Sequence, residues 1–338
     1  MTESQRTDVA IIGAGPVGLF AVFECGMLKM RAHVFDALDL PGGQCMALYP
    51  EKPIYDIPGY PEIEAAQLVE RLAEQAKPFA PVYHLGETVT SLAPEAGGGF
   101  RLTTSGGTAV IATAVIIAAG VGAFGPNRPP LEGIERFEGK SVFYLVQRRD
   151  AFRGKRVVIA GGGDSAVDWA LALAGIARSV QVVHRRPKFR AAPESAARLQ
   201  RLAEEGRIEL VVPYQLHALE GTDGQISRVI VADLDGKTRA LEAEALLAFF
   251  GLSMNLGPIA EWGLNLERNH IAVDPATSAT SVPGIFAIGD IATYPGKLKL
   301  ILTGFSEAAM AAHAIHPLVY PGEALHFEYS TMKGVPGR

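Results

Sequence analysis

Cysteine is scarce in this chain of 338 residues. Only Cys25 and Cys45 are present, and they do not form a C-x-x-C pair. Two cysteines are too few for the disulfide framework of a small secreted domain. Cys25 falls within a predicted helix, so we expect it to be an inert thiol of the core.

The chain also lacks a long uninterrupted apolar run. Residues 1–8 do not show the charged-then-apolar pattern of a signal peptide. Residues 108–127 carry no charge, but glycines and a proline interrupt their second half, and β-branched residues are frequent in their first half. This composition favours a buried strand leading into a turn over a membrane span. We therefore expect a soluble, cytoplasmic protein.

Neither sign of charge is in large excess. The formal net charge is −5, which argues against general affinity for nucleic acid. Residues 121–247 contain 19 Lys and Arg against 16 Asp and Glu. This mildly basic segment suits a phosphate-bearing ligand, although ordinary scatter of charge explains the same numbers. The length predicts about two domains, and 48% apolar residues allow a sizeable core.

The first motif is a glycine-rich turn between a strand and a helix. An apolar run at residues 8–12 leads into Gly13-Ala14-Gly15-Pro16-Val17-Gly18, and a helical pattern follows to about Met27. The first glycine permits a tight turn, the second lets the backbone approach a pyrophosphate, and the third allows close packing of helix on strand. The helix N-terminus presents free N–H groups and a positive dipole to the anion.

A carboxylate completes this motif. The next predicted strand, at residues 32–35, is followed by Asp36, 23 residues after Gly13. A carboxylate there can accept hydrogen bonds from a ribose diol. The alternative is a glycine turn with a structural role only. We predict a dinucleotide site that includes Gly13, Gly15, Pro16, Gly18 and Asp36.

A second unit of the same order lies in the middle of the chain. A strand at residues 156–160, a glycine turn, a helix at 165–175 and a strand at 180–183 precede His184-Arg185-Arg186. Arginine matches the oxygens of a 2′-phosphate, which a carboxylate would repel, so this site should prefer NADPH to NADH. A solvated basic loop is the alternative. The predicted contacts are Gly161, Gly163, Asp164, Ser165, His184, Arg185, Arg186 and Arg190.

The end of the chain fits the first unit better than the second. Residues 80–115 are rich in predicted strand, and residues 284–315 follow the order strand, turn, helix. We therefore predict a discontinuous first domain, residues 1–120 and 248–338, with a second domain, residues 121–247, inserted into it. Long low-complexity segments and arrays of repeats are absent from the sequence.

A third motif makes the comparison with known flavoproteins possible. Gly289-Asp290, after a predicted strand at residues 285–288, resembles the second FAD signature of flavoproteins that bind two dinucleotides. The order of the three motifs resembles that of bacterial thioredoxin reductases over nearly the whole chain. Those enzymes carry a redox C-x-x-C just before the second glycine turn, whereas residues 141–155 here contain no cysteine. Electrons then cannot leave by thiol–disulfide exchange.

The sequence instead resembles the thioredoxin-reductase-like ferredoxin–NADP⁺ reductases. The resemblance implies an α/β fold of two Rossmann-like nucleotide-binding domains, arranged as in thioredoxin reductase. Each domain would have three layers in the order β, β, α (three-layer ββα). The NADPH domain would be inserted in the FAD domain. The stretches that carry the resemblance are Gly42-Gly43-Gln44, residues 48–52 (LYPEK), residues 294–301 (YPGKLKLI) and the tail at 326–338.

The resemblance also implies the flavin contacts. Tyr49 would stack on one face of the isoalloxazine ring and Tyr329 on the other; the alternatives are a packed core tyrosine and a disordered tail residue. Hydride chemistry requires no nucleophile, metal or strong general base from the protein, and we assign none. Beyond the first glycine turn, the implied FAD contacts are Asp36, Gln44, Tyr49, Val89, Phe124, Asp290, Tyr329 and Thr331.

The implied activity is that of a ferredoxin–NADP⁺ reductase, which exchanges hydride between NADPH and FAD and single electrons between FAD and ferredoxin or flavodoxin. Such carriers are acidic, so a basic docking surface is expected, with a solvated charged face as the alternative. A homodimer is implied as well. The candidate docking residues are Arg148, Arg149, Arg153, Lys155, Arg156, Lys297 and Lys299.

Other functions stay open at this point. An NADPH diaphorase or quinone reductase would use the same flavin. A non-catalytic module that senses flavin or NADPH would need only the two sites. A thioredoxin-type reductase that uses Cys25 and Cys45 is disfavoured, because these cysteines are 20 residues apart within the FAD unit.

Overall fold

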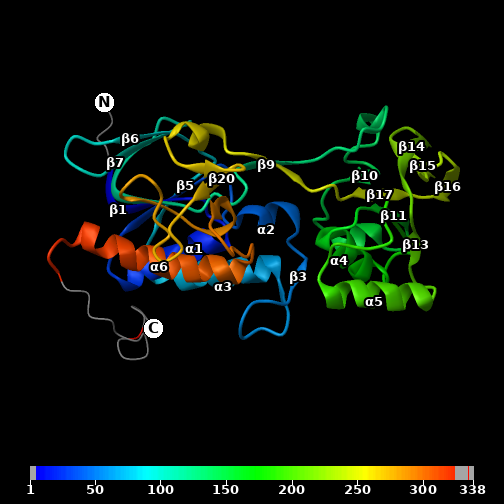
Figure 1. Cartoon of the computed structure of the whole chain (residues 1–338), viewed down its shortest axis with the longest axis horizontal. Coiled ribbons are helices and arrows are strands. Elements are labelled where there is room, and N and C mark those ends of the chain that lie inside the picture. The colour runs from blue at the N-terminus through cyan, green and yellow to red at the C-terminus, as the bar shows by residue number, and fades with distance from the viewer. Residues whose placement is uncertain (1–4, 324–333, 335–338) are drawn as a thin grey trace. The chain divides into compact units, whose positions relative to one another are not determined.

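The computed structural model describes residues 5–323 and Gly334. The chain divides into two compact units (Figure 1): unit 1 comprises Met1–Phe124 and Met254–Arg338, and unit 2 comprises Gly125–Ser253. The chain passes between them at strands β9 (Ala123–Pro126) and β18 (Leu252–Asn255), which pair with each other.

Unit 1 is built on a seven-stranded sheet. Its parallel part runs in the order β5-β2-β1-β8-β21. The second half of β8 pairs with β21, while the first half pairs with antiparallel β7, which in turn pairs with β6. The bounds are β1 (Gln5–Ile12), β2 (Ala32–Asp36), β5 (Val82–Leu85), β6 (Val89–Pro94), β7 (Phe100–Thr104), β8 (Ala109–Ile117) and β21 (Ile285–Ala287).

Three helices cover one face of this sheet (Figure 1). Helix α1 (Pro16–Met27) contacts both α3 (Ala65–Ala76) and α6 (Ile301–Val319). The buried side chains of α6 that face this core are mostly alanine, which allows the helix to approach closely. Strand residues such as Ile11 and Ile116 are fully buried against the helices. Strands covered on both faces are apolar at successive positions, as the VAII run of β1 is.

A second, smaller sheet covers the opposite face. Leu256, Ile259 and Ile271 pack against Phe35 and Ile117 of the large sheet. Unit 1 therefore has the order sheet, sheet, helix. The small sheet pairs β19 (Leu266–Glu267), β20 (His270–Ala272) and β22 (Ala292–Thr293), and the short 3-10 helices η4 (Gly257–Glu261) and η5 (Gly289–Ile291) flank it in sequence.

A short arm packs on α1 and α3. Cys45 of α2 (Gly43–Leu48), together with Ile57 and Ile63, contacts Leu19 and Leu72 in a separate buried cluster. The arm also contains β3 (Pro53–Ile54) and β4 (Ile63–Glu64), and the 3-10 helix η1 (Lys77–Phe79) follows α3.

Unit 2 repeats the layered plan. Its parallel sheet has the order β10-β17-β11-β12-β13, with α4 and α5 on one side and an antiparallel sheet, β14-β15-β16, on the other (Figure 1). Buried Val229 and Val231 of β15 pack against Val158 and Leu246 of the parallel sheet.

The elements of unit 2 have short connections. The parallel strands are β10 (Val142–Phe143), β11 (Arg156–Ala160), β12 (Ser179–Val183), β13 (Glu209–Val211) and β17 (Ala245–Ala248). The antiparallel strands are β14 (Gln215–Thr222), β15 (Gln225–Ala232) and β16 (Thr238–Glu242). The helices are η2 (Ile134–Arg136), η3 (Arg149–Phe152), α4 (Asp164–Leu173) and α5 (Pro193–Glu204).

The uncharged stretch at residues 108–127 contains the buried strand β8 followed by turns, as predicted. Among residues 5–323, no helix combines the length and apolarity that a bilayer crossing needs.

Candidate functional site

The three glycines of the first turn differ in the space around them: two are in close contact with the backbone and one is open. Gly13 has φ +113°, and a Cβ added there would lie 2.3 Å from the Ala118 carbonyl oxygen. A Cβ on Gly18 would lie 1.9 Å from the Gly13 oxygen, whereas a Cβ on Gly15 would meet nothing within 4 Å. Gly15 caps α1 with an ordinary φ of −68°. Gly13 and Gly18 are therefore required by packing, and Gly15 keeps space open in front of the helix N-terminus.

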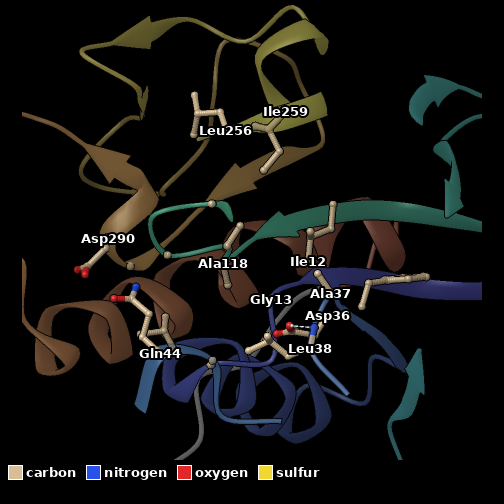
Figure 2. Close-up of a pocket in the computed structure, with 18 of the residues that line it drawn as sticks. Ile12, Gly13, Asp36, Ala37, Leu38, Gln44, Ala118, Leu256, Ile259 and Asp290 are labelled. Carbon is tan, nitrogen blue, oxygen red and sulfur yellow. Dashed lines mark hydrogen bonds between the residues drawn. The ribbon is translucent and has the colours of Figure 1, made fainter. Parts of the chain in front are cut away.

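Asp36 lies at the end of β2 beside this turn (Figure 2). Its carboxylate accepts hydrogen bonds from the backbone N–H of Ala14 at 2.7 Å and of Leu38 at 2.9 Å. The pKa of Asp36 is raised overall, because the effect of burial outweighs that of the two backbone hydrogen bonds, which lower it. Each oxygen has one backbone partner and keeps a lone pair, so the carboxylate can still accept from a ribose hydroxyl.

A cavity of about 530 Å³ opens from the turn. This volume lies in the range of pockets that hold one large ligand. Figure 2 shows Gln44 and Asp290 close together at one end, with Asp36 and Gly13 farther along and Leu256 and Ile259 on the opposite wall. Backbone N–H groups therefore meet carboxylates and an amide inside a largely apolar enclosure.

Tyr49 and Cys45 line the same cavity beside α2. The Cys45 thiol lies 3.9 Å from the Tyr49 hydroxyl oxygen. Burial raises the pKa of Cys45 to about 11 and raises the pKa of Tyr49 as well. Both groups are therefore neutral near pH 7, and Cys45 is not a thiolate nucleophile. Cys25 is fully buried, so the expectation of a core thiol is confirmed, and burial raises its pKa to about 12, which disfavours the reactive thiolate.

The cavity brings together most of the residues predicted to contact FAD. Gly18 does not line it and lies under the turn, against Gly13. Phe124 belongs to β9, and its side chain lies outside the described residues, as do Tyr329 and Thr331. The predicted residues that line the cavity are Gly13, Gly15, Pro16, Asp36, Gln44, Tyr49, Val89 and Asp290.

The wall opposite the turn was missing from the sequence-based prediction. Leu256, Ile259 and Trp262 line it, and they come from the segment that follows the second crossing between the units. They show no motif, because an apolar wall requires only the right shape and side-chain volume. Glu87 and Lys299, which line the cavity as well, were not predicted as FAD contacts either.

The second glycine turn, in unit 2, also has one glycine in close contact with the backbone and one that is open. A Cβ on Gly161, which has φ +155°, would lie 2.6 Å from the Phe249 oxygen. Gly163 caps α4 with φ −97°, and the nearest atom to an added Cβ is 4.0 Å away. Arg190 lies directly beside this turn, since its N–H donates to the Gly162 oxygen at 2.6 Å. Asp164 accepts from the Ala192 N–H at 2.9 Å, which holds the same loop in place.

His184 covers the turn from the end of β12. A Cβ on Gly162 would lie 2.2 Å from the imidazole, and the Phe189 ring is 5.2 Å away. Burial, then the nearby Arg185, lowers the pKa of His184, so its ring is neutral near pH 7. Arg185, Arg186 and Arg190 are exposed beside it, as is Ser165 at the start of α4. The structure thus gathers the residues predicted for a 2′-phosphate.

The candidate docking residues differ in their surroundings. Arg148 is exposed, whereas Arg153 pairs with Asp150 at 2.6 Å. Arg156 pairs with Glu242 and Glu244, and the Lys155 ammonium lies 5.9 Å from the centre of the Phe152 ring. The prediction for Lys297 is wrong, because its side chain is only 4% exposed in an ion pair with Glu307. The buried carboxylate of Glu307, which the KLK pattern does not reveal, holds the Lys297 ammonium away from solvent.

The two glycines of the first turn predict different mutational effects. Gly15→Val should change the free energy of unfolding by about 1 kcal/mol or less, since the position is open and its φ is ordinary. It should nevertheless abolish retention of the bound dinucleotide. Gly18→Ala should cost about 1–3 kcal/mol by overpacking. For each variant, urea unfolding measures the stability, and the amount of dinucleotide released per denatured chain measures retention. A Gly15→Val protein that retains one dinucleotide per chain would contradict this assignment.

Comparisons with known proteins agree with this architecture. The family of pyridine nucleotide-disulphide oxidoreductases matches residues 7–314. The chain is 66% identical over 332 residues to the ferredoxin–NADP reductase of Paramagnetospirillum magneticum, covering 98% of each chain. It is 67% identical over 338 residues to that of Acidiphilium cryptum, covering 100% of this chain and 99% of the relative.

Solved structures show the same fold. The thioredoxin reductase of Lactococcus lactis superposes with a TM-score of 0.80 at 27% identity, covering 93% of this chain and 99% of the other. That of T. acidophilum also gives 0.80, at 23% identity, covering 93% and 98%. The chain has the thioredoxin-reductase-like fold of two Rossmann-like domains. It belongs to the pyridine nucleotide-disulphide oxidoreductase family and, within it, to the ferredoxin–NADP reductases.

Proposed function

We propose that this protein is a ferredoxin–NADP⁺ reductase that carries electrons between NADP(H) and a one-electron carrier through bound FAD. The observation that carries the proposal is the pair of glycine turns with opposite charge beside them. Asp36 follows the first, and His184-Arg185-Arg186 follows the second. Two relatives at 66% and 67% identity bear the name ferredoxin–NADP reductase.

The cavity of unit 1 fits FAD by its donor set. The open face of Gly15 and the N-terminus of α1 suit a pyrophosphate. Asp36 keeps acceptor capacity for a ribose but would repel a 2′-phosphate. Gln44, Tyr49 and Asp290 line the part of the wall that we assign to the flavin end. When bound, FAD accepts a hydride and passes electrons on singly; the protein binds it, orients it and excludes water.

The turn of unit 2 fits NADP(H). Gly163 leaves the N-terminus of α4 open, and Arg185 and Arg186 offer exposed guanidinium groups where a 2′-phosphate would lie. The boundaries of the two units support a discontinuous FAD domain with an inserted NADPH domain.

Thioredoxin reduction is disfavoured despite the shared fold. Cys25 and Cys45 are free and buried, their pKa values are raised, and the segment at residues 141–155 contains no cysteine. A buried thiol with a raised pKa is a poor nucleophile for disulfide exchange. The electron acceptor must therefore be one that takes electrons from the flavin itself. We propose that the acceptor is ferredoxin or flavodoxin. We also propose that the reductase is a homodimer and acts in the cytoplasm.

Removing the arginines of unit 2 should relax the choice of nicotinamide nucleotide. Arg185→Ala/Arg186→Ala should raise the KM for NADPH by at least about tenfold, since the loss of even one charge-assisted hydrogen bond, worth about 1.5–3 kcal/mol, corresponds to that factor or more. The KM for NADH should change little. Arg207→Ala, an exposed arginine beyond α5, is the control. Steady-state flavin-dependent dye reduction measures both constants, and an unchanged NADPH preference would count against the second site.

Reversing charge at the proposed docking surface should weaken the binding of the electron carrier and leave the reaction with NADPH unaffected. Arg148→Glu/Arg149→Glu should raise the KM for ferredoxin and flatten its dependence on ionic strength, because rim charges steer an acidic partner. NADPH-dependent dye reduction should stay unchanged. Arg207→Glu applies the same kind of charge change elsewhere in unit 2. If the double variant turns over ferredoxin like the wild type at every salt concentration, this surface is not the dock.

A further inference from the structure

A buried carboxylate lies behind the cavity of unit 1. Glu307, in the second turn of α6, is only 2% exposed. One of its oxygens accepts the backbone N–H of Gly289 at 2.8 Å. The other accepts the Tyr294 hydroxyl at 2.6 Å and the Lys297 ammonium. The side chains of Lys297 and Glu307 are 4% and 3% exposed, so the pair is shielded from water.

These contacts join three segments that border the cavity. Gly289 begins η5 with φ +74°, and the next residue, Asp290, lines the cavity. Tyr294 and Lys297 belong to the loop that leads to the lining residues 299–301. Glu307 itself belongs to α6. One side chain therefore fixes the Gly-Asp turn and the loop to the same helix.

Stability does not explain this arrangement. A buried ion pair recovers in Coulomb attraction little more than the two charges lose in hydration, and apolar residues of the same size are often as stable. Tyr294 adds a directional contact, since burial and Glu307 raise its pKa to about 12 and keep the hydroxyl as a donor. What the cluster supplies is geometry: a carboxylate that accepts on both oxygens from fixed donors.

We propose that Glu307 is a positioning residue for the FAD site, and that Lys297 and Tyr294 hold it so that Asp290 and the loop form the cavity wall before the cofactor binds. This inference rests on the proposed function, because it takes the cavity to hold FAD. It assigns a role within the fold to Lys297, the first of the two lysines in the YPGKLKLI stretch.

Glutamine cannot replace Glu307 in this cluster. If its oxygen accepts from Gly289, its amide N–H groups face the Lys297 ammonium. If it is flipped, the amide faces the Gly289 N–H. Either orientation brings two donors together. Replacing Lys297 by methionine at the same time removes the conflict, since the amide can then donate to the Tyr294 hydroxyl.

The test measures FAD release from the holoenzyme, followed as the rise of flavin fluorescence after dilution, beside the urea midpoint of each variant. Glu307→Gln should release FAD at least about tenfold faster, which corresponds to about 1.4 kcal/mol. Lys297→Met should do the same. Lys297→Met/Glu307→Gln should return to within about threefold of the wild type. Tyr294→Phe, which keeps both charges, should give a smaller increase and remains informative if a single charge variant fails to fold.

Asp8→Asn is the matched control. Asp8 also bridges a backbone N–H and a cation, both from Arg31, but it lies in the middle of β1 and does not line the cavity. It should lower the urea midpoint without changing FAD release. If the Glu307 and Lys297 variants also lose only stability, or if the double variant releases FAD as fast as the singles, the positioning role is overturned. A wild-type protein that carries no flavin would instead refute the proposed function.

Discussion

The approach of the β1–α1 turn to the end of β8 is the contact on which the rest of unit 1 depends. A Cβ on Gly13 would lie 2.3 Å from the Ala118 oxygen, and one on Gly18 would lie 1.9 Å from Gly13 itself. Only glycine allows α1 to start this close to the sheet. The first N–H groups of α1 then lack intrahelical partners and face the cavity. An anionic ligand at this point would complete the hydrogen bonding that the fold leaves open.

Unit 2 has the same kind of glycine turn, but different side chains lie beside it. Gly161 and Gly163 repeat the roles of Gly13 and Gly15, one close to the backbone of Phe249 and the other open. The distinction lies in the side chains that follow the second strand of each unit. In our proposal, the carboxylate of Asp36 selects a 2′-hydroxyl, and the exposed arginines beyond His184, whose imidazole is neutral, select a 2′-phosphate by charge. Two copies of one supersecondary unit can therefore hold two different nucleotides.

The local motifs were accessible from the sequence because backbone geometry dictates them. The predicted strand at residues 156–160 coincides with β11, and the helix predicted to end at about Met27 ends there. β1 begins three residues earlier than predicted, at Gln5, because pairing with Val110 of β8 extends a polar segment that has no strand pattern of its own. Such pairing is a tertiary effect.

Non-local features were less accessible. The apolar wall of Leu256 and Ile259 has no signature, and Lys297 was assigned to the surface on composition alone. Its burial depends on Glu307, ten residues farther along and on another element. A one-dimensional pattern shows which residues carry charge, but the ion pair is decided by the packing of α6 against the Gly-Asp turn. Tyr329 and Thr331, which the family resemblance assigns to FAD, lie outside the described residues.

Anaerobic stopped-flow mixing tests the central claim most directly. The purified protein is mixed first with NADPH and then with oxidised ferredoxin, while flavin and ferredoxin absorbance are followed separately. The account predicts rapid loss of the flavin absorbance, followed by its return as ferredoxin becomes reduced. Bleaching by NADPH without subsequent reduction of ferredoxin would contradict the assigned acceptor, and the absence of bleaching would contradict the coupling of the two nucleotide sites.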